Sequence, residues 1–267
     1  MKPEHKKLIV KEKYNEIAGK SKLQDQSSCC GSTGCCDGMD YTVFNDDYTG
    51  QEGYNPDADL GLGCGMPLEF AGLKKGYHVL DLGSGAGNDC FVARTQVGES
   101  GRVTGLDFTD AMIDKAKQNL KKTGFRNIEF IRGDIEDMPF PGNYCDVVIS
   151  NCVLNLVPDK KKAFSEIYRI LKPGGHFCIS DIVLAGQLPE KLKEAAEMYA
   201  GCVSGALQID EYLEIIEEQA FKAAEIKKHK EIILPNAFLL NYLTMDELRN
   251  FKRSEAGILS ITVTAVK

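Results

Sequence analysis

The chain of 267 residues contains no tryptophan and only four histidines. His5, His78, His176 and His229 are scattered along the sequence and lack the spacing of paired metal ligands. None of them is placed where a histidine general base would be expected. His78 alternates into an apolar segment, so we expect it to be structural. Because tryptophan is absent, tyrosine is the intrinsic fluorophore that can report ligand binding.

The chain also lacks a long apolar run and an excess of basic residues. No segment approaches the ~18 apolar residues that span a bilayer, and residues 1–13 are charged, without the apolar core of a signal peptide. Lys and Arg total 32 against 39 Asp and Glu, which gives a net charge of −7. Nucleic-acid binders usually carry a basic stripe or patch. We therefore expect a soluble, cytoplasmic protein that binds neither membranes nor nucleic acid.

What the chain does contain is enough apolar material for a substantial core. An apolar share of 43% is typical of one large domain, or of one domain with an appended lobe. We expect an N-terminal helix and a Cys-rich arm in residues 1–60, because residues 27–55 are rich in Gly, Ser, Asp, Asn and Tyr. A ligand-binding core is expected in 61–185, followed by a region that completes the fold in 186–267. No internal repeat is present, and a monomer is expected.

Strands and helices alternate from residue 77 onward. Hydrophobic periodicity predicts strands at 77–82, 102–106, 128–132, 146–150 and 176–183, and helices at 89–96, 110–122 and 161–171. This alternation indicates right-handed β–α–β crossovers and a parallel sheet. Further helices are predicted at 6–17, 189–207 and 210–220, and further strands at 224–234 and 258–266. The last segment alternates as an edge strand or an antiparallel strand does.

A glycine loop follows the first predicted strand, with the sequence Asp81-Leu82-Gly83-Ser84-Gly85-Ala86-Gly87. Its spacing departs from the dinucleotide fingerprint, because Asn88 stands where the third glycine is expected. Asp81 disfavours a pyrophosphate so close by and favours a cationic ligand. Asp107 ends the second strand, where a carboxylate binds ribose hydroxyls, and Asp134 follows the third, placed to accept from an adenine amine. One such carboxylate is ordinary, but three on successive strands indicate S-adenosylmethionine, which carries an ammonium and a sulfonium.

These segments, together with Gly105-Leu106-Asp107, Gly133-Asp134 and Leu171-Lys172-Pro173-Gly174-Gly175, resemble the class I methyltransferase family. The resemblance covers residues 77–183 and implies a Rossmann-like α/β fold. That fold has a mostly parallel seven-stranded sheet with helices on both faces, extended here by a C-terminal helix/strand region and a loop-rich N-terminal arm. The cofactor-binding residues it implies are Asp81, Gly83, Ser84, Gly85, Gly87, Asp107, Phe108, Met112, Gly133, Asp134, Ile135 and Asn151.

Ten cysteines are unusual for a chain of this kind. If the compartment is reducing, they are thiols rather than a disulfide framework. Three lie in apolar runs and are expected to be small buried side chains: Cys90, Cys145 and Cys178. Four crowd a polar segment: Cys29, Cys30, Cys35 and Cys36. The remaining three sit beside glycine or at a strand end: Cys64, Cys152 and Cys202.

The segments around the last three cysteines closely resemble arsenite methyltransferases of the microbial type. They are Gly61-Leu62-Gly63-Cys64-Gly65, Ile149-Ser150-Asn151-Cys152-Val153-Leu154-Asn155-Leu156 and residues 200–207, with Ser27-Ser28-Cys29-Cys30-Gly31 upstream. The resemblance runs from about residue 13 to 207. It implies that Cys64, Cys152 and Cys202 bind As(III), and that cysteines return the pentavalent product to the trivalent state. Cys29 and Cys30, with Cys64, are the candidates for supplying the electrons of this reduction. Thioredoxin or glutathione is the implied external reductant.

The chemistry of arsenic is consistent with this interpretation. Trivalent arsenic is soft and thiophilic, and soft centres select thiolate ligands. Three thiolates leave the arsenic lone pair available to attack a sulfonium methyl group in line. No proton has to be removed, so no general base is required, in contrast with methylation of oxygen or nitrogen.

Several alternatives remain open at this stage. For each of Cys64, Cys152 and Cys202, the alternative is a purely structural role as a packed side chain. Cys29, Cys30, Cys35 and Cys36 supply the four thiolates of a structural zinc site, although zinc ribbons use C-x-x-C spacing. The core motifs alone also permit methylation of an organic small molecule such as a quinone precursor. A protein that binds metalloids without catalysis is a third hypothesis, which the three carboxylates disfavour.

Overall fold

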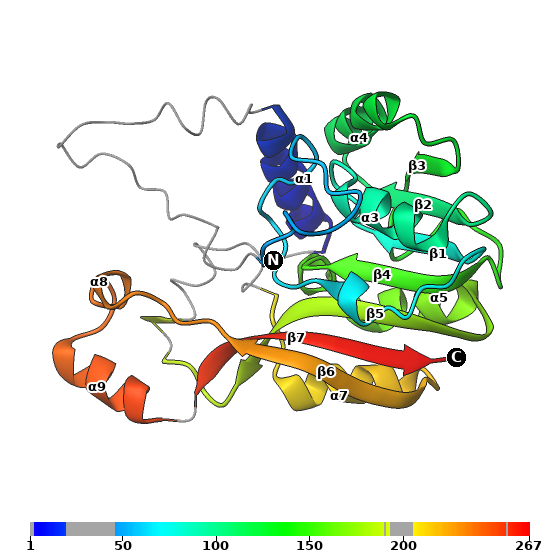
Figure 1. The fold of residues 1–267 in the computed structure, drawn as a ribbon. Helices are drawn as coiled ribbons and strands as arrows, with labels where there is room; N and C mark the ends of the chain where they lie inside the picture. Colours follow the sequence, from blue (N-terminus) through cyan, green and yellow to red (C-terminus); the bar gives the residue numbers. More distant parts are fainter. Residues whose placement is uncertain (1–2, 20–45, 190, 193–204, 255) are drawn as a thin grey trace.

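A computed structural model of the chain describes residues 3–19, 46–189, 191–192, 205–254 and 256–267. At its centre lies a seven-stranded sheet with the order β3-β2-β1-β4-β5-β7-β6 (Figure 1). The strands are β1 (His78–Leu82), β2 (Arg102–Asp107), β3 (Ile128–Arg132), β4 (Cys145–Asn151), β5 (Leu171–Ala185), β6 (Lys222–Glu231) and β7 (Gly257–Val266). Only β7 runs antiparallel to its neighbours, β5 and β6. The predicted fold class is therefore confirmed.

Helices cover both faces of the sheet because neighbouring strand residues point to opposite sides. The helical segments are α1 (Pro3–Gly19), η2 (Pro67–Glu69), α3 (Asn88–Val97), α4 (Asp110–Thr123), η3 (Leu154–Leu156), α5 (Lys160–Ile170), α7 (Ile209–Glu218), α8 (Asn236–Leu239) and α9 (Met245–Arg253). Val79 and Val147 pack into a cluster with α3 and α4. Leu80 and Val148 pack into a second cluster with α5 and α7. Both faces of the central strands are thus buried, as parallel sheets require.

Two of the predicted strands need comment. Of the two alternatives for the segment 258–266, an edge strand or an antiparallel strand, the structure shows the antiparallel one: β7 lies inside the sheet, and β6 forms the edge. The strand after α5 begins at Leu171 instead of residue 176, and its pairing with β4 shifts between Cys145 and Val147. The Pro-Gly-Gly sequence therefore forms an irregular first part of β5. Most of the helix predicted at 189–207 and of the arm at 27–55 lies outside the described residues.

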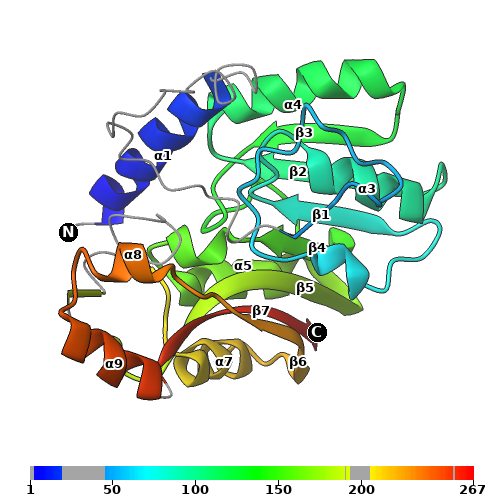
Figure 2. The ribbon, with the colours of Figure 1, turned by 60° about the vertical axis from the view of Figure 1, so that its left-hand side comes forward.

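The first helix lies across the carboxyl ends of the strands, beside α4 (Figure 2). The Lys115 ammonium donates to the carbonyl oxygen of Ala18 at 3.2 Å, and Lys11 forms an ion pair with Asp110 at 3.3 Å. Helix α1 therefore covers the edge of the sheet at which ligands bind in open α/β folds.

Three cysteines and one histidine have the structural roles that the sequence predicts. Cys90, Cys145 and Cys178 are fully buried, and burial raises the pKa of Cys145 and of Cys178 to about 12. Such thiols are unreactive. The His78 ring contacts the Tyr144 carbonyl oxygen and the Thr104 hydroxyl, each at 3.0 Å.

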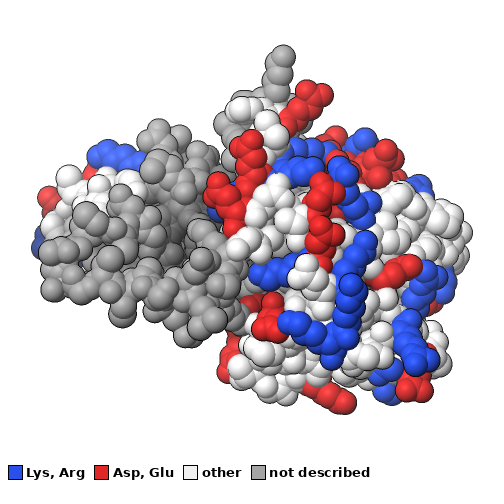
Figure 3. Space-filling view, turned by 90° about the horizontal axis from the view of Figure 1, so that it is seen from above, with Lys and Arg blue, Asp and Glu red and all other residues white. Residues whose placement is uncertain are grey.

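The surface mixes charges of both signs. On the face seen in Figure 3, basic and acidic side chains are interspersed over the described part of the molecule. No helix in the described ranges combines the length and apolar character needed to cross a bilayer.

Candidate active site

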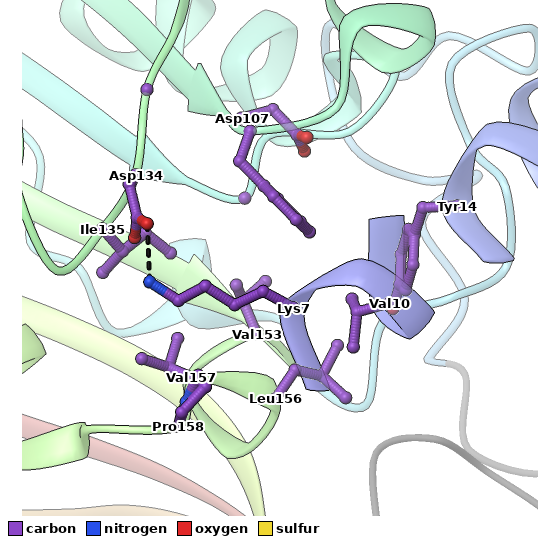
Figure 4. A pocket seen from close by; sticks show the side chains of 13 residues that line it. Lys7, Val10, Tyr14, Asp107, Asp134, Ile135, Val153, Leu156, Val157 and Pro158 are labelled. Carbon is purple, nitrogen blue, oxygen red and sulfur yellow. Dashed lines mark hydrogen bonds and ion pairs between the residues drawn. The ribbon is translucent and has the colours of Figure 1, made fainter. Parts of the chain in front are cut away.

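Two adjoining pockets lie at the carboxyl edge of the sheet. The first is lined by α1 and by the loops that follow β1, β2, β3 and β4 (Figure 4). The second extends from the glycine loop to Cys152. Tyr14, Gly83, Asp107 and Val153 line both pockets, which makes them one continuous crevice.

Most of the predicted cofactor residues line this crevice. They are Asp81, Gly83, Ser84, Gly85, Asp107, Phe108, Met112, Gly133, Asp134, Ile135 and Asn151. Gly87 does not, but it caps α3 at a φ of +98°, and a Cβ there would lie 2.7 Å from the Phe130 ring. Gly83 has a φ of +68°, and a Cβ there would lie 2.4 Å from Val153. Glycine is therefore required at both positions to fold the loop against its neighbours.

Asp107 sits where the two pockets meet. It is 7% exposed, and its carboxylate oxygens accept from the backbone N–H groups of Thr109 at 2.8 Å and Gly85 at 3.1 Å. Burial raises the pKa of Asp107, and these N–H groups oppose that shift by stabilising the charged form. Asp107 also lines both pockets, where a carboxylate can accept from a ligand hydroxyl.

The first pocket is mostly apolar, with one ion-pair cluster at its rim. Val10, Phe108 and Leu156 are among the apolar residues that line it. The Lys7 ammonium donates to Asp134 at 2.6 Å and also contacts Glu136 (Figure 4). The sequence predicted Asp134, but it did not predict that α1 supplies this wall. The amphipathic pattern of residues 6–17 indicates a buried face without indicating what that face covers.

The second pocket is strongly acidic. Asp59, Asp81, Asp89 and Asp107 line it, and its described lining includes no Lys, Arg or His. Burial, followed by repulsion from Asp89, raises the pKa of Asp81 well above its ordinary value. Burial raises the pKa of Asp89 to about 6. A cationic ligand relieves this repulsion by simple Coulomb attraction. Asp89 was missed by the sequence analysis, although its place in the first turn of the helix after a glycine loop was a usable signal.

Cys152 is part of the wall of the second pocket. It is 3% exposed and lines the pocket beside Asn151. Its φ of +62° lies in the left-handed region, which residues with a side chain seldom occupy. Its backbone N–H donates to the Ser180 carbonyl at 2.8 Å, which fixes this conformation at the end of β4. Unfavourable backbone conformations of this kind cluster at functional sites.

The structure brings Cys64 next to Asn151 and into the same apolar cluster as Cys152. The Cys64 backbone N–H donates to the Asn151 amide oxygen at 3.0 Å, and Cys64 shares an apolar cluster with Cys152. The flanking glycines make the approach possible. A Cβ on Gly63 would lie 2.6 Å from the Asn151 side chain, and one on Gly65 would lie 2.7 Å from the Ser180 hydroxyl oxygen.

A buried acid lies near the two thiols and was also missed by the sequence analysis. The Tyr212 hydroxyl donates to Asp181 at 3.2 Å. Burial raises the pKa of Asp181 to about 7. Burial and Asp181 raise the pKa of Tyr212, and charge on Cys64 or Cys152 adds to that shift. Both thiols therefore lie within electrostatic range of this pair.

The remaining predicted site residues cannot be placed. Cys202, Cys29 and Cys30, with Cys35 and Cys36, lie outside the described residues. Within the described ranges, no group of three or more His, Cys, Asp and Glu is arranged to hold a metal ion.

A model of the methyltransferase domain family matches residues 73–220. The chain belongs to this family. The chain is 41% identical over 241 residues to an arsenite methyltransferase of Halobacterium salinarum, and the match covers 86% of this chain and 60% of that protein. It is 36% identical over 114 residues to a demethylmenaquinone methyltransferase of Listeria monocytogenes, covering 43% of this chain and 48% of that protein.

The fold is also similar to that of a solved structure. An arsenic(III) S-adenosylmethionine methyltransferase from Chlamydomonas reinhardtii matches with a TM-score of 0.66 and 35% identity, over 77% of this chain and 67% of that chain. The chain spans 40 to 65% of the length of the curated arsenite methyltransferases that it matches.

The acidic pocket predicts that the protein releases protons when a cationic cofactor binds. The raised pKa values of Asp81 and Asp89 mean that the ligand-free site holds protons which ionised aspartate would have lost. A cation favours the ionised forms, so the affinity for S-adenosylmethionine should rise with pH through the region around 6. In the ligand-free protein Asp89 lowers stability as the pH rises from about 4 to 6, because the folded state binds more protons than the unfolded state, and Asp81 acts in the same direction.

Titration calorimetry in two buffers of different ionisation enthalpy measures this proton release directly. Asp89→Asn should reduce the number of protons released, whereas Asp114→Asn, an exposed change on α4, should leave it unchanged. Binding that is independent of pH between 5 and 8 would contradict the prediction.

The ion pairs of Lys7 predict a role in retaining the cofactor. Lys7→Met removes the contacts between α1 and the loop after β3, and partly exposed pairs of this kind contribute about 1 kcal/mol or less. We expect dissociation of S-adenosylmethionine to become about fivefold faster, as measured by stopped-flow tyrosine fluorescence. Lys6→Met, an exposed neighbour, is the control. Faster association with unchanged dissociation would instead show that Lys7 obstructs Asp134.

Proposed function

We propose that the chain is an S-adenosylmethionine-dependent arsenite methyltransferase. The observation that carries the proposal is the acidic crevice lined by Cys152, with Cys64 bonded to the neighbouring Asn151. The residues of the crevice fit the cofactor: the mostly apolar first pocket suits adenine, Asp107 suits the ribose, and Asp81 and Asp89 suit the ammonium and sulfonium charges. When bound, S-adenosylmethionine supplies an electrophilic methyl group.

The protein contributes binding and orientation to the proposed reaction. Cys64, Cys152 and Cys202 hold As(III) as thiolates, which soft centres prefer. The arsenic lone pair forms the new As–C bond as the sulfonium C–S bond breaks, and the C–S electron pair stays on sulfur. Arsenic is thereby oxidised from the trivalent to the pentavalent state, and no proton needs to leave. A general base is therefore unnecessary, in keeping with the absence of histidine from the described lining of both pockets.

Two electrons must then return to arsenic. We propose that a pair of cysteines supplies them by forming a disulfide, with Cys29, Cys30 and Cys64 as the candidates. An external dithiol or thiol, thioredoxin or glutathione, reduces that disulfide by thiol exchange. The proposal places the protein in the cytoplasm as a monomer.

The role of Cys202 is proposed from the resemblance of residues 200–207 to arsenite methyltransferases. Gly205, the described end of that segment, packs against Asn155, three residues after Cys152: a Cβ on Gly205 would lie 1.7 Å from the Asn155 carbonyl oxygen. This contact supports the choice of Cys202 as the third thiolate.

We also propose three functional regions. Residues 1–60 form the N-terminal helix and Cys-rich arm, residues 61–185 bind the cofactor, and residues 186–267 complete the sheet and the arsenic site. Support for the last assignment comes from Leu239 and Leu248, which pack in the same apolar cluster as Cys64 and Cys152.

Methyl transfer to arsenite is the decisive experiment. Purified protein with S-adenosylmethionine, arsenite and a thiol reductant should produce methylated arsenic, separated and quantified over time by chromatography with elemental mass spectrometry. The core similarity to a quinone methyltransferase makes an organic acceptor the second candidate. Failure to methylate arsenite, together with failure of As(III) to quench tyrosine fluorescence, would favour that candidate.

A further inference from the structure

Tyr48 lies between the acidic pocket and the Cys64 loop, and neither the motifs nor the proposed mechanism assign it a role. Its ring is 4% exposed. Its hydroxyl lies within hydrogen-bonding distance of the Gly65 carbonyl at 3.1 Å and of the Asp89 carboxylate at 3.3 Å. It also accepts from the Asn151 amide at 2.9 Å. One hydroxyl therefore touches a cofactor-pocket carboxylate, the backbone beside Cys64, and the residue before Cys152.

The Asn151 side chain contacts the same two groups, the Gly65 carbonyl and the Asp89 carboxylate. Its amide nitrogen donates to the Gly65 carbonyl at 2.8 Å and lies 3.5 Å from Asp89, while its oxygen accepts from the Cys64 N–H. Tyr48 has one donor proton and the Asn151 amide has two. Tyr48 and Asn151 therefore have three donor protons for five donor–acceptor contacts, and the Asp89 carboxylate competes with the Gly65 carbonyl for them. A change in the charge or contacts of Asp89 changes how many of these protons remain for Gly65.

The Cys64 loop has little room to absorb a change in these bonds. Gly65 approaches Ser180 so closely that a methyl group would not fit. The Ser260 hydroxyl donates to the Cys64 carbonyl at 2.5 Å. A shift of the Gly65 carbonyl must therefore be transmitted to Cys64 and its thiol.

We propose that Tyr48 is a positioning residue that couples occupation of the cofactor pocket to the placement of Cys64. A cationic ligand at Asp89 changes the sharing of protons among Asp89, Tyr48 and Asn151, and the Gly65 carbonyl follows. The cofactor thereby orders one of the thiols that the proposed function assigns to arsenic. The assignment of Cys64 to arsenic rests on the proposed function, whereas the coupling between the cofactor pocket and Cys64 does not.

Alkylation of Cys64 provides a test that needs no arsenic. Cys64 is labelled with iodoacetamide, with and without saturating S-adenosylhomocysteine, and its modification rate is measured by peptide mass spectrometry. In the unmodified protein the ligand should slow alkylation by about fivefold or more, a typical coupling between two sites. In Tyr48→Phe, which keeps the ring and loses the hydroxyl, this protection should fall below about twofold. Tyr54→Phe, whose hydroxyl contacts Asp59 at 3.1 Å, is the matched control and should retain the full protection.

A double-mutant cycle with Asp89→Asn extends the test. If both residues act through one network, Asp89→Asn should lose the protection as Tyr48→Phe does, and the double variant should lose no more. The affinity for As(III), measured with and without S-adenosylhomocysteine, should show the same loss of coupling. Full ligand protection of Cys64 in Tyr48→Phe overturns the inference. Absence of As(III) binding in the unmodified protein would refute the proposed function, while the alkylation result still decides the coupling.

Discussion

Replacing Cys152 with serine is expected to reduce methyl transfer to arsenite by about 100-fold or more, since a hard hydroxyl replaces a soft arsenic ligand. Binding of S-adenosylmethionine should survive, because serine preserves the shape of the Cys152 side chain and the carboxylates of the crevice are unchanged. Methylated arsenic and cofactor affinity are measured on the same preparation. Cys202→Ser is expected to give the same separation of activity from binding.

Cys145→Ser is the appropriate control for Cys152→Ser. Cys145 is fully buried at the opposite end of the same strand, and its thiol lies 3.9 Å from the Ile170 carbonyl. Serine there is expected to preserve methyl transfer at a modest cost in thermal stability. Full activity of both Cys152→Ser and Cys202→Ser would mean that arsenic is not held by these thiols.

Replacing Asp107 with alanine should weaken S-adenosylmethionine binding by about 100-fold or more. Two hydrogen bonds from ribose hydroxyls to a carboxylate would be lost, and each bond to a charged group is worth about 1.5–3 kcal/mol. The variant also leaves the N–H groups of Gly85 and Thr109 without the acceptor that orders this end of β2. Titration calorimetry measures the affinity, and circular dichroism confirms that the variant is folded.

Asp114→Asn is the control for the Asp107 prediction. Asp114 is exposed on α4, seven residues away along the chain. Its replacement should change the affinity by less than about twofold, as surface charges usually do. An Asp107→Ala variant with unchanged affinity would place the ribose elsewhere in the crevice.

The glycine loop and the carboxylates could be predicted because each is a local feature. Asp81 precedes the glycines by two residues, and Asp107 and Asp134 lie where strands end or loops begin. The ends of parallel strands meet at one edge of a sheet, so the strand pattern alone placed these residues together. The likeness of the cysteine segments to arsenite methyltransferases likewise depended on contiguous residues.

The residues that were missed depend on contacts between distant parts of the chain. Tyr48 and Asn151 are 103 residues apart, and Lys7 and Asp134 are 127 apart. Asp89 is an exception, because it lies only eight residues after Asp81 and its place in the first turn after the glycine loop was a usable local signal. Hydrophobic periodicity reports which side of an element is buried, but it does not report which element covers that side.

By itself, the sequence determined the alternation of strands and helices, the cofactor loop with its three carboxylates, and the cysteines available for soft chemistry. These follow from spacing over a few residues, which fixes backbone conformation and the direction of neighbouring side chains. The tertiary structure alone decided that α1 covers the crevice, and that Asn151 and Tyr48 hold Cys64 beside Cys152. Those contacts exist only after the whole sheet has assembled, because packing against it brings loops so far apart in the chain to one edge.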